Sequence, residues 1–171
     1  AEDGSQSSGI YYIALTFAAI FSSAKEAIVN AFTPWLFSNI NKKSETEISK
    51  IITTIFSGAG LLAIGVAWFS REVLILLSSN PDFIEAYRYI PFAVMSLFII
   101  FLGQVYNIKT YYFGKYNRFL FIATLFGIVA DIIACYFLVK PYGVYGAVTA
   151  RILGFSTHVI IIAYLSNLEK E

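Results

Sequence analysis

Four ionisable side chains lie well inside apolar stretches of the sequence: Lys25, Glu26, Asp131 and Arg151. A charged side chain near the centre of a membrane helix costs at least about 2.5–3.5 kcal/mol, so such residues usually face a charged partner or a water-filled cavity. There a carboxylate can hold a proton or a cation, and a lysine or arginine can hold an anion. These residues are therefore the candidates for ligand binding and ion coupling.

The first apolar stretch carries a polar stripe of Ser22, Glu26, Asn30 and Thr33 at helical spacing. Lys25 lies about 100° around the helix from Glu26, so we expect these neighbours not to pair directly. One interpretation is a hydrogen-bonded contact with helices outside this sequence. The other is the wall of a polar cavity, in which Lys25 meets an anion and Glu26 a proton or cation.

Asp131 and Arg151 lie on either side of a Lys-Pro-Tyr-Gly turn, each about two helical turns from it. This spacing predicts similar depths on adjacent antiparallel helices and a salt bridge that sets the register of the hairpin. His158 follows on the side of Arg151, where a lone histidine is more typical of a packed side chain than of a proton relay. A shorter polar face of the third apolar stretch consists of Gln104, Asn107 and Tyr111.

The composition of the 171-residue chain indicates a membrane protein, with 58% hydrophobic residues, 13% charged residues and a mean hydropathy of +0.70. Soluble domains carry about 25% charged residues. The net charge of +1 gives no reason to expect a nucleic-acid partner. The single cysteine excludes an internal disulfide, and no glycine-rich phosphate loop, HExxH or GxSxG motif is present. We therefore expect neither an enzyme nor a bound cofactor.

Apolar stretches separated by polar segments recur along the whole chain, without the alternation of a membrane β-barrel. Each is close to or above the length of about 20 residues that a helix needs to cross the hydrocarbon core. The sequence therefore predicts an all-α polytopic membrane helix bundle with about five transmembrane helices. Their expected ranges are about 9–34, 48–69, 84–112, 119–139 and 144–165.

The distribution of basic residues at the helix ends predicts the orientation in the membrane. The ends predicted to be cytoplasmic carry Lys42, Lys43, Lys50, Lys109, Lys115, Arg118 and Lys170, whereas the opposite ends carry Arg71, Arg88 and Lys140. The first residue is then outside and the last inside.

Small residues predict where the helices pack, because they let helix backbones approach closely. They form one stripe on each of the last two helices, and glycines recur on the second helix. The residues are Gly146, Ala150 and Gly154; Gly127, Asp131, Ala134 and Cys135; and Gly58, Gly60 and Gly65.

Three segments resemble the bacterial polysaccharide flippases of the multidrug/oligosaccharidyl-lipid/polysaccharide transporter superfamily. They are SGIYYIALTFAAI, the following AFTPWLF, and ADIIACYFLVKPYGVYGAVTAR. In the last segment, Pro141, Gly143, Gly146 and Ala147 match the turn before the final helix of that family. Asp131 and Cys135 stand where the family has asparagines, and Arg151 where threonine is common, which favours a locally acquired Asp131–Arg151 pair.

The resemblance implies that residues 1–171 are the C-terminal transmembrane region of a two-lobed, twelve-helix carrier in the bacterial cytoplasmic (inner) membrane. The loop-like start of the chain, AEDGSQSSG, also leads us to expect a fragment. Its partners would be the N-terminal lobe of the same protein, membrane lipids and a lipid-linked oligosaccharide. The cargo would be an undecaprenyl-diphosphate-linked repeat unit of O-antigen or capsule, moved by alternating access.

The resemblance and the intramembrane charges together give the candidate site. Lys25, Glu26, Asn30 and Arg151 are expected to bind substrate, and Glu26 and Asp131 are the candidates for coupling to H⁺ or Na⁺. One alternative is a cation-coupled multidrug exporter of the same superfamily. Another is a membrane scaffold subunit that transports nothing. A glycan polymerase or ligase would normally carry a large periplasmic loop, which this sequence lacks.

Overall fold

The computed structural model describes residues 2–39, 42, 44–77, 84–113 and 117–168, and in these ranges it contains helices and turns but no strand. The predicted all-α helix bundle is confirmed. The elements are α1 (Glu2–Asn39), α2 (Glu45–Trp68), α3 (Ser70–Leu77), the short 3₁₀ helix η1 (Glu85–Arg88), α5 (Ile90–Phe113) and α6 (Asn117–Leu168).

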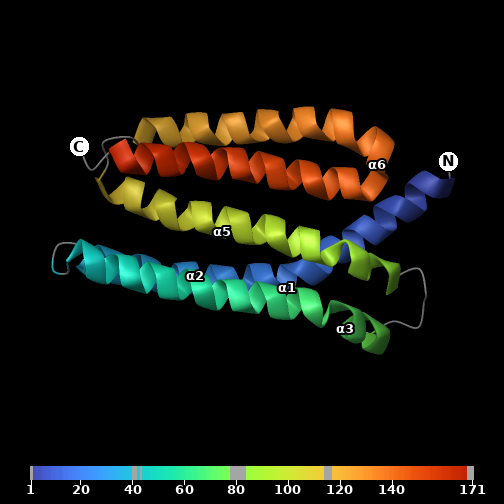
Figure 1. The fold of residues 1–171 in the computed structure, drawn as a ribbon, viewed down its shortest axis with the longest axis horizontal. Coiled ribbons are helices and arrows are strands. Elements are labelled where there is room, and N and C mark those ends of the chain that lie inside the picture. The colour runs from blue at the N-terminus through green and yellow to red at the C-terminus, as the bar shows by residue number, and fades with distance from the viewer. Residues whose placement is uncertain (1, 40–41, 43, 78–83, 114–116, 169–171) are drawn as a thin grey trace.

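Helix α6 folds back on itself, so it supplies the last two of the predicted helices (Figure 1). Gly143 has φ 55° and ψ −126°, a backbone conformation that glycine adopts at little cost because it lacks Cβ. Pro141 precedes the reversal and cannot donate a backbone hydrogen bond. We call residues 117–142 the outer arm of α6 and residues 144–168 its inner arm.

Figure 1 shows α5 between the α1–α2 pair on one side and the α6 hairpin on the other. Helices α1, α5 and the inner arm run in one direction, while α2 and the outer arm run in the opposite one, so the N- and C-termini lie at opposite ends. Lys43, Lys115 and Lys170, which contribute to the predicted orientation, lie outside the described residues.

Within the described ranges, four helical segments are long and apolar enough to cross a membrane. These are Ser8–Asn39, Thr46–Trp68, Ile90–Ile108 and Phe119–Tyr164, the last of which contains the reversal at Gly143. The chain thus has the length and composition of a multi-pass membrane protein.

The core consists of buried apolar clusters where α1 and α2 meet α5. At one end, Phe21 of α1 packs against Phe98 of α5, with ring centroids 6.4 Å apart, and the same buried cluster includes Leu74 of α3. Toward the other end, Phe101 of α5 packs edge-on against Phe56 of α2, with ring centroids 5.9 Å apart. Local sequence starts α2, because Ser44 and Glu47 form a reciprocal capping box at its first turn.

Close glycine contacts hold the α6 hairpin together, as the small-residue stripes predict. A Cβ added at Gly154 would lie 2.6 Å from Cβ of Asp131, and one added at Gly127 would lie 3.0 Å from Cβ of His158. A Cβ at Gly146 would overlap the carbonyl group of Leu138. Among the glycines of α2, Gly58 and Gly65 meet nothing within 4 Å, so the chain leaves those positions open.

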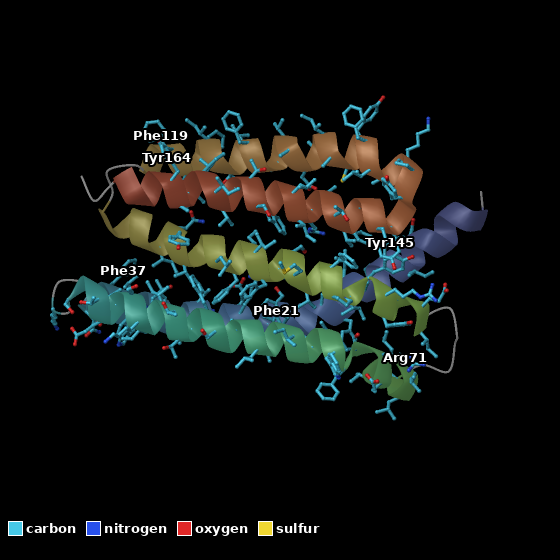
Figure 2. All side chains as sticks on the ribbon, viewed as in Figure 1. Phe21, Phe37, Arg71, Phe119, Tyr145 and Tyr164 are labelled. Atoms are coloured by element: carbon cyan, nitrogen blue, oxygen red, sulfur yellow. The ribbon has the colours of Figure 1, made fainter. Side chains whose placement is uncertain are left out.

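The outer arm exposes a continuous band of large apolar side chains, which point away from the rest of the bundle (Figure 2). A band of this composition suits contact with lipid acyl chains. It consists of Phe121, Ile122, Leu125, Phe126, Ile128, Val129, Ile132, Ile133, Tyr136 and Phe137.

Candidate functional site

A buried lysine joins α1 to α5 through a polar network. Lys25 is only 4% exposed, and its Nζ donates to Glu26 Oε1 and, at 3.2 Å, to Gln104 Oε1. The amide of Gln104 also donates to Glu26 Oε1 at 3.5 Å. A buried ammonium group is tolerated only when it is paired and hydrogen-bonded, and this network supplies both requirements.

The expectation that Lys25 and Glu26 do not pair is therefore wrong, because the two side chains form a salt bridge. Helical spacing fixes the direction of each Cβ, but both side chains are long and flexible enough to bend around the helix. Gln104, singled out in the sequence only as part of a polar face on α5, accepts from the same ammonium and brings the two together.

Next to the buried Lys25, α1 carries a face of polar and small residues that the rest of the described chain does not cover. The Glu26 side chain is 50% exposed, and Asn30, one turn further on, is exposed as well. Hydroxyl groups of this helix satisfy themselves locally: Ser23 donates to the carbonyl of Ala19 and Thr33 to that of Val29. We call the exposed residues Thr16, Ala19, Ser23, Glu26, Ala27 and Asn30 the polar face of α1. The apolar side chain of Ile20, which is 54% exposed, lies among them.

Helix α2 adds exposed hydroxyl residues at the end of the bundle where α1 finishes. Thr53, Thr54 and Ser57 are exposed, and each donates to a backbone carbonyl four residues earlier. These residues raise the polarity of this end without placing an unsatisfied group in it.

The predicted Asp131–Arg151 salt bridge is not formed among the residues that the structure describes. Arg151 instead donates to the hydroxyl oxygen of Tyr11 on α1 at 3.4 Å, and its guanidinium lies 5.6 Å from the ring centroid of Phe155. The Asp131 carboxylate accepts from Sγ of Cys135 at 3.8 Å.

The hairpin register explains this difference. The backbone of Asp131 lies against Gly154, as that of Gly127 lies against His158. Asp131 is therefore level with a residue one helical turn beyond Arg151. Counting turns from the ends of the arms placed the charges at the same depth, but an error of one turn, about 5.4 Å, is enough to separate them.

Two further polar residues pack within the bundle. His158 lies between Gly103 of α5 and Gly127 of the outer arm, as expected for a packed side chain. Asn107 has a buried Oδ1 with no hydrogen-bond partner among the described residues. The side chain of Tyr111, predicted to share its face, lies outside the described residues.

The sequence predicts that Lys25, Glu26 and Asn30 belong to one site, and the structure places them within two turns of α1. It separates Arg151 and Asp131 from them, toward the end at which the α6 hairpin turns. The role of Tyr11 was missed, and nothing in its sequence context distinguishes it from the many other tyrosines.

Within the described ranges, no group of three or more His, Cys, Asp or Glu residues could hold a metal ion. Comparisons with protein-family models, with curated proteins and with solved structures find no match to this chain.

Proposed function

We propose that this chain is the C-terminal part of a carrier that moves a lipid-linked oligosaccharide across the bacterial cytoplasmic membrane by alternating access. In this proposal the cargo is an undecaprenyl-diphosphate-linked repeat unit. The N-terminal lobe of the same protein faces the polar face of α1, and the cargo passes between the two.

The observation that carries the proposal is the polar face of α1. Glu26 lies well inside a segment long and apolar enough to cross a membrane, yet half of its side chain is exposed. A carboxylate in contact with acyl chains is strongly unfavourable, so this face requires water or protein. The outer arm of α6, with its large apolar side chains, has the composition of the lipid-facing side.

The chemistry of this face suits a phosphorylated glycan. The exposed Asn30 amide can donate and accept hydrogen bonds with sugar hydroxyls. Lys25 supplies a positive charge directly below the surface, held by Glu26 and Gln104. A diphosphate that replaces Glu26 as the partner of Lys25 keeps the buried ammonium group paired, and the half-exposed Glu26 carboxylate is released to water. Arg151, held by Tyr11, supplies a second cation closer to the opposite end of the path.

The proposal is tested in the intact carrier with Lys25→Gln and Asn30→Leu, measured by surface glycan and by the amount of protein in the membrane. Asn30 is exposed, so its replacement leaves the fold intact while removing a sugar contact. Both variants are expected to lose surface glycan at normal protein level. The matched control is Lys140→Gln, which removes an exposed charge outside the polar face of α1 and should leave glycan unchanged. Normal glycan in both α1 variants rejects the proposal.

A cation-coupled multidrug exporter is the second candidate, and the half-exposed Glu26 carboxylate favours it. In that case Glu26 carries the coupling ion, and transport of a cationic drug depends on the pH or sodium gradient and is lost in Glu26→Gln. Asp131, which accepts a hydrogen bond from Cys135, is the second coupling candidate and is tested by Asp131→Asn. A scaffold subunit predicts that none of these variants changes transport.

A further inference from the structure

A cavity of about 500 Å³ opens at the end of the bundle where α2 passes into α3 and the α6 hairpin turns. Its volume lies within the range of small-molecule sites, about 300–1,000 Å³. The side chains that give the cavity its chemical character are Trp68, Arg71, Glu72, Tyr87, Arg88 and Tyr145. It is separate from the polar face of α1, and no step of the proposed transport uses it.

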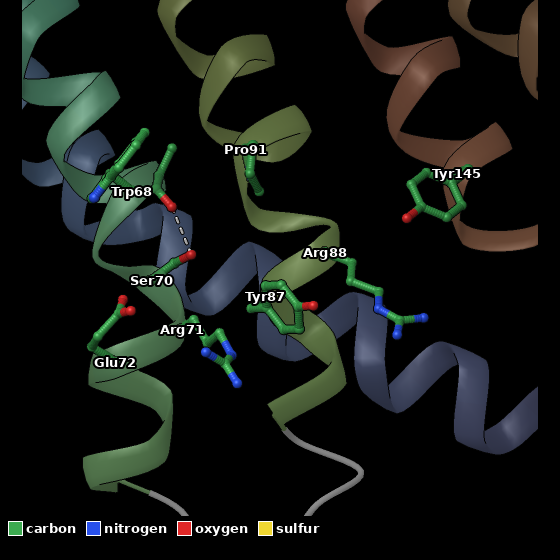
Figure 3. Close-up of a pocket in the computed structure, with 9 residues that line it drawn as sticks. Trp68, Ser70, Arg71, Glu72, Tyr87, Arg88, Pro91 and Tyr145 are labelled. Carbon is green, nitrogen blue, oxygen red and sulfur yellow. Dashed lines mark hydrogen bonds between the residues drawn. The ribbon is translucent and has the colours of Figure 1, made fainter.

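The cavity positions two guanidinium groups around a single tyrosine. The Arg71 guanidinium lies over the ring of Tyr87, 5.8 Å from its centroid, and Arg88 lies on the other side of that ring (Figure 3). Arg88, like any arginine, is charged at every physiological pH, and a hydrogen bond with Tyr87 raises its pKa further. A guanidinium presents a planar set of donors that matches the oxygens of a phosphate, and stacking on an aromatic ring orients this set before a ligand arrives.

The acidic residues near the cavity do not neutralise Arg71 and Arg88, so both guanidinium groups can bind an anion. Among the described residues, no carboxylate lies within ion-pair distance of Arg71. Arg88 pairs with Glu85 at 3.7 Å, but both side chains are more than half exposed, and an ion pair of this kind contributes little. The Glu72 carboxylate also lines the cavity and reduces its positive potential, so the attraction for an anion comes from the two guanidinium groups.

The surroundings of the cavity have the character of a membrane–water boundary. Helix α3 buries Leu74 against the core, but Leu76 is 84% exposed and Leu77 is similarly free. Trp68, which lines the cavity itself, is 77% exposed. An amphipathic helix with exposed leucines lies at the boundary between acyl chains and headgroups, where tryptophan is also enriched. The arginines therefore lie at the depth of lipid phosphates.

We propose that this cavity binds the phosphate of an anionic lipid headgroup, with the acyl or prenyl chain lying along the exposed side of α3. Arg71 and Arg88 hold the phosphate oxygens, and Trp68 lies where the headgroup meets the chain. Both an anionic phospholipid and a polyprenyl diphosphate carry this chemistry. The inference depends only on the cavity and its boundary position, so it stands or fails separately from the proposed transport.

Trp68 provides a reporter within the cavity. The chain has only one other tryptophan, Trp35, so Trp35→Phe leaves Trp68 as the single source of tryptophan fluorescence. The purified protein is mixed with brominated phosphatidylglycerol or brominated phosphatidylcholine in micelles, and quenching of Trp68 is measured. Phosphatidylglycerol is expected to quench at lower concentration, because the choline group of the other lipid neutralises its phosphate.

The arginines are tested with Arg71→Gln and Arg88→Gln, singly and together. Each is expected to reduce the preference for phosphatidylglycerol about five-fold, as for the removal of one basic residue near an anionic surface. Lys140→Gln is the matched control, because Lys140 is an exposed charge at the same end of the bundle but outside the cavity. Circular dichroism establishes whether each variant is folded. If Arg71→Gln does not fold, Arg88→Gln provides the test, because the Arg88 side chain is exposed.

An unchanged preference in the folded arginine variants overturns the proposal, as does an equal loss in Lys140→Gln, which indicates general surface attraction. A polyprenyl diphosphate is then added as a competitor in the unsubstituted background. Relief of quenching shows that the cavity also takes the lipid-linked diphosphate. Quenching that persists assigns the arginine-dependent site to phospholipid.

Discussion

Lys25 keeps its charge at a buried position because two acceptors from different helices surround its ammonium group. Glu26 belongs to the same helix, whereas Gln104 belongs to α5, so the network also fixes how α1 sits on α5. Removing a partner from such a network costs more than removing the charge itself, because the charge that remains is left buried without compensation.

The network of Lys25, Glu26 and Gln104 predicts an order of stability for its variants. Glu26→Ala should lower the free energy of unfolding by about 1.5–3 kcal/mol, the value of a hydrogen bond to a charged group. Lys25→Met removes the buried charge at similar volume and should cost less. Asn30→Ala, on the exposed face, should change stability by less than about 0.5 kcal/mol. Thermal unfolding in detergent measures all three, and a larger loss for Lys25→Met than for Glu26→Ala contradicts the network.

The separation of Asp131 from Arg151 gives a second prediction. Because the two groups do not pair, exchanging them in Asp131→Arg plus Arg151→Asp should not restore the expression that either single change loses. Tyr11→Phe should instead lower stability by about 0.5–1.5 kcal/mol, because it removes the acceptor of Arg151. Expression and unfolding midpoints are the measurements. If the double variant regains the expression level of the original protein, Asp131 and Arg151 do form a salt bridge.

At the scale of elements, the α6 hairpin depends on positions where no side chain fits. Gly146→Ala places Cβ against the Leu138 carbonyl and should cost about 1–3 kcal/mol, the usual range for overpacking. Gly58→Ala is the matched control on α2, where nothing lies within 4 Å. It should stabilise the protein by about 0.5–1 kcal/mol, because glycine weakens a helix interior. Equal effects of the two substitutions on the unfolding midpoint exclude close packing of the hairpin.

Helices were predictable because long apolar stretches between polar loops have few other structures available in a membrane. The reversal at Gly143 was predictable from the same punctuation, since proline and glycine stand together there. The small-residue stripes predicted the close contact between the two arms of α6, but the pairing of charged side chains was not predictable. The Asp131–Arg151 error came from a register that differs by one turn, and the Lys25–Glu26 error came from side-chain flexibility. The register of the hairpin and the conformations of long side chains both depend on tertiary packing, which helical spacing does not determine.

Considered as a whole, the molecule has two faces of opposite character. The outer arm of α6 presents a band of phenylalanine, isoleucine and leucine, whereas α1 presents alanine, serine, asparagine and a carboxylate together with the single exposed side chains of Tyr12, Ile20 and Phe37. A bundle with lipid on every side would be expected to expose large apolar side chains on all of its faces. In the proposed carrier, the outer arm of α6 would face lipid and the polar face of α1 would face water and the second lobe.

The alternating directions of the helices predict that the two ends of the chain lie on opposite sides of the membrane, with the C-terminus in the cytoplasm. A green fluorescent protein fused after residue 171 should therefore fluoresce, because it folds in the cytoplasm but not when exported unfolded. Alkaline phosphatase at the same position should be inactive. The reverse pattern contradicts the predicted orientation and leaves the fold unaffected.

The most direct test of the account asks whether the polar face of α1 is in contact with water inside the membrane. In a Cys135→Ser background, the substitutions Ser23→Cys and Asn30→Cys probe α1, and Ile133→Cys and Phe137→Cys probe the outer arm of α6. Thiols react as thiolates and therefore need water. In the full-length protein in membranes, a charged maleimide should label the α1 positions and not the α6 positions, while all four should be labelled after denaturation. Unlabelled α1 positions in the native protein, or equal labelling of both helices, would contradict the central claim.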